Sequence, residues 1–136
     1  MKKILFAVLT SFILFGCTDT KKQEETLLNE VIKVHDQVMA KDELVMTNKM
    51  QLDTLLKQNI APEVNAGAID LAKQLDTADA HMENWMHKFD AENKGKSHNE
   101  IMTYLTDQKK QIENIDKELN STIASSAKFI KQHKTK

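Results

Sequence analysis

A chain of 136 residues with a formal net charge of −1 has the size of one domain, and its charge balance excludes nucleic-acid binding driven by net positive charge. Lys, Glu, Gln, Leu and Ala are abundant, whereas the chain holds only three Gly and one Pro. Because the first group favours helices and the second interrupts them, this composition predicts an all-α protein.

The first 16 residues have the pattern of a bacterial secretion signal. Met1-Lys2-Lys3 is followed by an apolar run that ends at Phe15. A run of about 12 apolar residues is too short for a transmembrane helix, which needs roughly 20. A short apolar run behind positive charge is instead typical of a signal peptide that is cleaved.

Leu14-Phe15-Gly16-Cys17 resembles the lipobox of bacterial lipoproteins, although Phe15 is bulkier than the residue usual at that place. The resemblance implies cleavage of residues 1–16, lipid on Cys17, and a membrane-anchored location in the cell envelope, periplasmic or at the outer membrane. The alternative is an ordinary signal peptide that happens to contain the one cysteine. Without a second cysteine, the remaining 120 residues can form no internal disulfide, and their formal charge is about −3.

The rest of the chain divides into a polar spacer and three long segments. Residues 17–25 hold no large apolar side chain, and we expect them to form a flexible tether between lipid and fold. Beyond them, the helix breakers fall in two places only, at Pro62 with Gly67 and at Gly95. The predicted helices cover about 26–59, 66–92 and 98–132, within one domain, 26–133. Long helices with short connections predict an antiparallel, coiled-coil-like, up-down-up bundle of three helices.

The first predicted helix carries two apolar rows side by side. One row consists of Leu27, Val31, Val34, Val38, Val45, Leu52 and Leu55, and the other of Leu28, Ile32, His35, Met39, Met46 and Met50. A stripe this wide suits a helix that contacts two neighbours at once. Lys41-Asp42 interrupts both rows, so we expect a kink or a short break there.

The second and third predicted helices each carry one row with the alternating spacing of coiled coils. These rows are Leu71, Leu75, Ala78, Met82, Trp85 and Phe89, and then Ile101, Leu105, Gln108, Ile112, Ile115, Leu119, Thr122, Ser126 and Phe129. The second helix is expected to stop near Asn93-Lys94-Gly95, a typical C-terminal cap sequence. Ser97-His98-Asn99-Glu100 fits the capping box that starts a helix.

Equal rise along antiparallel helices places several methionine and aromatic side chains at similar levels. The expected packing cluster is Trp85, Phe89, Met102 and Tyr104, with His35, Met39, Met82 and Met86 close by. One interpretation is a methionine-rich core, because methionine fills irregular gaps and packs well on aromatic rings. The other is a copper site made by His35, Met39, Met82 and Met86, because thioethers and imidazole suit Cu(I).

Haem bound through His35 and a core methionine is a third interpretation, and it would be non-covalent because the chain has no Cys-x-x-Cys-His run. The sequence also lacks a Glu-x-x-His pair, a His-Glu-x-x-His run, a phosphate-binding glycine loop and a nucleophile elbow. We therefore expect a structural or interaction module rather than an enzyme. Its expected partners are a membrane, through the lipid on Cys17, and another envelope protein, without nucleic acid or a cofactor.

His35-Asp36-Gln37-Val38-Met39, the run from Ala78 to Phe89, Tyr104-Leu105 and the lipobox together resemble small envelope lipoproteins from Bacteroidota. Members of this family often carry the label "viral A-type inclusion protein". The resemblance implies a lipid-anchored helical domain and supplies no catalytic residues. Ala40 stands where such relatives are expected to carry a proline, so the chain departs from them just before Lys41.

Overall fold

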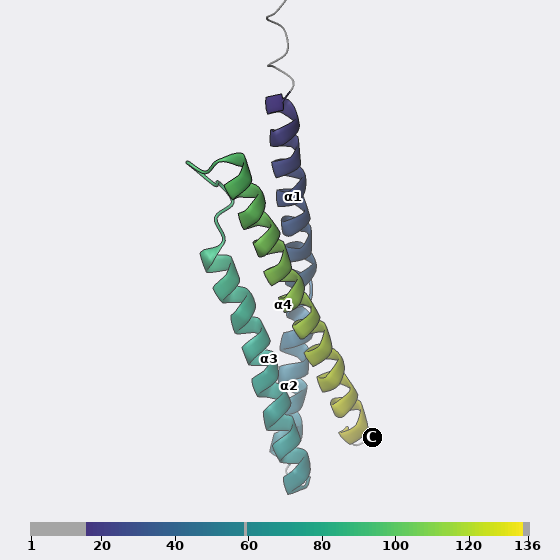
Figure 1. Ribbon diagram of the computed structural model, residues 1–136. Coiled ribbons are helices and arrows are strands. Elements are labelled where there is room, and N and C mark those ends of the chain that lie inside the picture. Colours follow the sequence, from purple (N-terminus) through teal and green to yellow (C-terminus); the bar gives the residue numbers. More distant parts are fainter. Residues whose placement is uncertain (1–15, 59, 135–136) are drawn as a thin grey trace, which may run out of the picture.

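The computed structural model describes residues 16–58 and 60–134, and within them it holds helices and no strand (Figure 1). The helices are α1 (Gly16–Met39), α2 (Asp42–Gln58), α3 (Pro62–Lys88) and α4 (His98–His133). α1 and α2 continue one another past a slight bend, so the chain forms three rods, each antiparallel to the one before it. The predicted all-α bundle is confirmed. The expected signal peptide, 1–16, lies outside the described residues except for Gly16.

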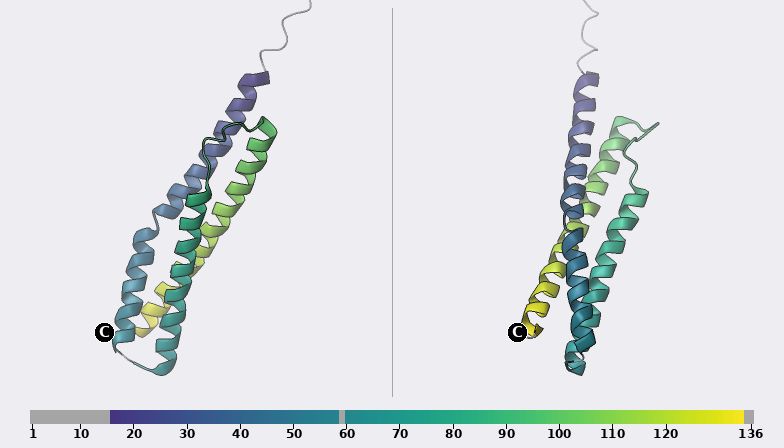
Figure 2. Two further views of the ribbon diagram at one scale, coloured as in Figure 1. Left: turned by 90° about the vertical axis from the view of Figure 1, so that its left-hand side faces the viewer. Right: turned by 180° about the vertical axis from the view of Figure 1, so that it is seen from behind.

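Each rod buries one face, and α4 packs against all three other helices (Figure 2). The buried core consists mainly of Val31, Val38, Val45, Leu52, Leu75, Ala78, Met82, Trp85, Leu105, Ile112, Leu119 and Ile130. These side chains lie in the predicted rows of all three segments, except that Ile130 is buried near the end of α4, where the predicted Phe129 is only partly buried. Because apolar burial is the dominant favourable term in folding, this continuous core holds the rods together without any disulfide.

The start of α4 is fixed by the predicted capping box. The Ser97 hydroxyl accepts a hydrogen bond from the Glu100 backbone N–H at 3.5 Å, and the Glu100 carboxylate accepts one from the Ser97 N–H at 2.8 Å. Two N–H groups that would lack helical partners are satisfied in this way. α4 then continues for 36 residues, which corresponds to about 54 Å.

The ends of α3 differ from the prediction of about 66–92. The helix begins at Pro62, because a proline in the first turn needs no N–H partner and already has a helical φ. It ends at Lys88: the Phe89 N–H still donates to the Trp85 carbonyl, but the Asp90 N–H donates instead to the Tyr104 hydroxyl on α4, at 2.7 Å. Asn93 and Gly95, with φ of 51° and 77°, form a turn in the loop and do not cap the helix.

The predicted interruption near Lys41 is confirmed as a break between α1 and α2, so the first helix does not run unbroken over 26–59. The Lys41 N–H donates to the Val38 carbonyl at 2.9 Å. This bond reaches back three residues, whereas an α-helical bond reaches back four. The Lys41 ammonium pairs with Asp116 on α4. Val38 and Val45 are both buried on either side of the break, so the core row continues across it.

The prediction of a flexible tether over 17–25 is wrong, because α1 already begins at Gly16. The spacer is rich in Lys, Gln and Glu, which favour helices even where no apolar face is buried. Gln23 donates to Asp19 at 3.3 Å one turn away, and Glu24 pairs with His98 at 2.7 Å. Residues 16–23 therefore form a helical stalk, which projects past the loop between α3 and α4 (Figure 1).

The second apolar row of the first rod is left largely uncovered. Its exposed members are Ile32, Met39, Met46 and Met50, with exposed fractions of 40%, 42%, 51% and 68%. We call these four residues the outer row. Three rods give the first rod only two neighbours, and the buried row already meets both. None of the four described helices combines the length and apolar composition of a membrane span.

Candidate functional site

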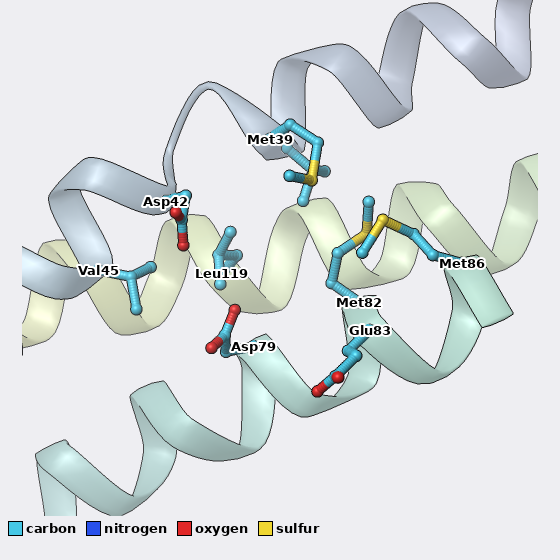
Figure 3. A pocket seen from close by; sticks show the side chains of 9 residues that line it. Met39, Asp42, Val45, Asp79, Met82, Glu83, Met86 and Leu119 are labelled. Atoms are coloured by element: carbon cyan, nitrogen blue, oxygen red, sulfur yellow. The ribbon is translucent and has the colours of Figure 1, made fainter.

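The break between α1 and α2 opens a groove against α3, with a volume of about 250 Å³ (Figure 3). Its walls are Val38, Met39, Asp42, Val45, Asp79, Met82, Glu83, Met86 and Leu119. Met39 is the last residue of α1 and Asp42 the first of α2, so the break itself turns both toward α3. We call this the methionine groove.

Three thioethers from two helices meet in this groove. Met82 and Met86 lie one turn apart on α3, and their sulfur ends lie next to one another, with Met39 across the groove (Figure 3). Met82 is only 4% exposed and belongs to the core, whereas Met39 and Met86 are 42% and 38% exposed. The groove therefore has one donor fixed by packing and two that solvent reaches.

Carboxylates form the polar part of the same groove. Asp42 and Asp79 point into it from opposite walls (Figure 3), and within the described chain neither makes an ion pair. Glu83 lies 3.7 Å from the His87 ring nitrogen. No lysine, arginine or histidine occurs among the nine described residues that form the walls, so the groove carries negative charge only.

His35, the fourth predicted copper ligand, lies outside the methionine groove. Its Nδ1 is 3.0 Å from the Asp36 carboxylate, and its ring centroid is 6.1 Å from that of Trp85. The structure thus brings together three of the four predicted ligands and places the histidine on the aromatic side of α3. Among the described residues, no three His, Cys, Asp or Glu side chains converge to hold a metal ion.

Three of the four residues of the predicted packing cluster, Trp85, Phe89 and Tyr104, form a stack of rings. Trp85 and Phe89 are 4.8 Å apart between centroids and nearly parallel at 19°, and Phe89 and Tyr104 are 6.2 Å apart at 13°. The Lys96 ammonium lies 4.9 Å from the Tyr104 centroid, within reach of a cation–π interaction. Met102, the fourth predicted member, is half-buried and does not belong to the buried core.

The shifted pKa values belong to structural contacts rather than to a reactive site. The Lys96 ammonium, together with the Asn93 N–H, lowers the pKa of Asp90 in the loop after α3. Hydrogen bonds from the Ser97 hydroxyl and N–H lower the pKa of Glu100 in the capping box. Both acids are exposed and help to fix how the chain enters α4.

No protein-family model, curated protein or solved structure gives a significant match to the chain.

Sequence reasoning missed Asp42 and Asp79 as parts of the groove, because carboxylates on polar helix faces are usually only solvated. Asp79 directly follows the buried Ala78, at the edge of the core row, and this position could have indicated that it lines the groove. Asp42 gave a signal of its own, since it opens α2 immediately after the break.

Proposed function

We propose that this protein is a lipid-anchored, non-enzymatic interaction module of the bacterial cell envelope. The lipobox resemblance, the single cysteine at its end and the resemblance to Bacteroidota envelope lipoproteins support the anchor. Lipid on Cys17 would provide two or three acyl chains, and two are enough for stable attachment where one is marginal.

The stalk supports a defined orientation for the anchored bundle. Cys17 and Glu24 are seven residues apart in α1, which is about 10 Å along a helix axis. Glu24 is joined to His98 at the start of α4. The loop between α3 and α4 would therefore face the membrane at short range, and the outer row would rise away from it along the side of the first rod.

The outer row is the observation that carries the interaction role. Ile32, Met39 and Met46 follow at intervals of seven residues, and all three are exposed, so they form a stripe along one side of the rod that crosses the break between α1 and α2. From Ile32 to Met50 the stripe is about 27 Å long. An exposed apolar stripe of this length and spacing suits the packing of one further helix, as in a four-helix bundle.

The charges beside the outer row define the chemistry of that helix. Asp36 lies one turn after Ile32, and Glu43 lies one turn before Met46. On the opposite margin are the acidic walls of the methionine groove. We propose that the partner is an amphipathic helix of another envelope protein, apolar along its centre and lined with Lys or Arg on both sides, because such charges would pair with these margins.

Site-specific cross-linking in cells tests this proposal. A photo-reactive residue at Thr47, beside the row, should capture one envelope protein that contains a helix of the stated kind. Ile32→Asp with Met46→Asp should abolish capture by placing charge in the apolar contact. Leu44→Asp is the matched control, because Leu44 is 52% exposed and lies outside the outer row.

Capture that survives the double substitution, or that Leu44→Asp removes equally, would refute the interaction role. Mass spectrometry of the mature N-terminus tests the anchor separately. The expected product begins at Cys17 and carries diacylglyceryl on sulfur. A mature chain that retains residues 1–16 would overturn the anchored arrangement.

A further inference from the structure

We propose that the methionine groove binds one soft monovalent cation, Cu(I) or Ag(I), through the thioethers of Met39, Met82 and Met86. This site shares Met39 with the outer row, but it depends on the sulfur atoms in the groove, whereas the interaction role depends on the apolar character of the row, which Met39→Leu preserves. The proposal excludes His35, which the fold places against Trp85.

The donor set matches the chemistry of these ions. Thioether sulfur is a soft, neutral ligand that selects Cu(I) over the hard divalent metals. Met82 and Met86 project from adjacent turns of one helix, and Met39 faces them from another, so the three donors surround a common space (Figure 3). Because methionine has three rotatable bonds, Met39 and Met86 can close on an ion that Met82 holds from the core side.

The charge of the groove favours a cation as occupant. Asp42 and Asp79 point into it, Glu83 adds a third carboxylate, and α4 contributes only Leu119 to the walls. Carboxylate oxygens are hard ligands and poor partners for Cu(I), so these groups act on the ion through their charge. His87 is the nearest base to this acidic set, at 3.7 Å from Glu83, and it is not one of the groove walls.

The chain supplies its own internal comparison. Met46 and Met50 also stand one turn apart, on α2, and they are more exposed than Met39 and Met86. Neither lines the methionine groove, so they have no third thioether opposite them. Met46 and Met50 therefore serve as a control: they have the same sulfur chemistry but no groove. If soft metals were only attracted to surface methionines in general, this pair would bind them as well.

The test is a Cu(I) titration of the full chain, purified in detergent, against a competing chromogenic Cu(I) chelator under reducing conditions. Cys17→Ser is used throughout, because the thiol of any chain that carries no lipid on Cys17 would itself bind Cu(I). The expected result is one Cu(I) per chain, with a dissociation constant below micromolar. Met39→Leu with Met86→Leu should weaken binding at least 100-fold, whereas Met46→Leu with Met50→Leu should leave it within twofold.

Two further measurements distinguish the thioether site from a folding defect and from binding by histidine. Leucine matches methionine closely in volume, so circular dichroism should show unchanged helix content in both double variants. The affinity at pH 6 should equal that at pH 8, because thioethers do not titrate and histidine does so in this interval. Binding weaker than micromolar, equal losses in the two double variants, or a steep fall of affinity at pH 6 would each overturn the site.

Discussion

A single methyl group added at Gly67 tests how closely α3 and α4 pack at the end of the bundle far from the stalk. A Cβ at this position would lie 2.8 Å from Cε2 and 2.9 Å from Cζ of the Phe129 ring. Carbon atoms at ordinary contact are about 3.5–4.0 Å apart. The ring must therefore shift, and it already packs on His133 with centroids 4.5 Å apart.

Two opposing effects decide the outcome for Gly67→Ala. Alanine favours the helix over glycine by about 1 kcal/mol, whereas overpacking of this kind costs about 1–3 kcal/mol. We expect a net loss of about 1 kcal/mol in the free energy of unfolding. For a domain of this size, that lowers the thermal midpoint by about 3–6 °C, which circular dichroism at 222 nm measures directly.

A double-mutant cycle with Phe129→Leu separates the two effects. In that background the clash is relieved, so Gly67→Ala should become stabilising by up to about 1 kcal/mol. Gly95→Ala is the control: its φ of 77° makes a side chain cost about 1–2 kcal/mol although no neighbour lies within 4 Å. Phe129→Leu should not rescue it. Equal stabilisation by Gly67→Ala in both backgrounds would refute the close packing.

Three further outcomes follow from contacts in the bundle. Ser97→Ala removes the hydroxyl of the capping box and should cost about 0.5–2 kcal/mol in chemical denaturation. Leu75→Ala opens a cavity at a fully buried site and should cost about 2–5 kcal/mol, whereas a loss under 1 kcal/mol would mean that the core there is loose. The pKa values of Asp90 and Glu100 are lowered in the folded protein, so their stabilisation is present at neutral pH and is lost as the pH falls below about 4. Urea midpoints at pH 6, 4 and 3 should show this loss, and Glu100→Gln should reduce it.

The parts of the fold that sequence predicted are those governed by local or periodic signals. The side chains of Ser97 and Glu100 each accept a hydrogen bond from the other residue's backbone N–H regardless of the rest of the fold, so the start of α4 at His98 could be predicted directly. The spacing of buried residues such as Leu75 and Leu119 identified the core rows, because each follows from helical repeat alone.

The parts that sequence missed depend on contacts between distant segments. α3 ends at Lys88 because the Tyr104 hydroxyl, on another helix, receives the Asp90 N–H, and no local pattern indicates that bond. Glu24, just after the stalk, pairs with His98, which is 74 residues away in the sequence, so no local pattern indicates this contact. Likewise, Met39 meets Met82 and Met86 only because a break after Met39 changes the direction of the chain.

The stalk is the first part of α1 and continues without a break into the part that packs on α4. This continuity has a mechanical consequence. A pull on Cys17 would run along the axis of α1, parallel to its long contact with α4. Such a load shears the whole interface at once instead of peeling it open turn by turn. A protein anchored at Cys17 would therefore resist a pulling force between the membrane and a bound partner, because many contacts along the interface would have to break together.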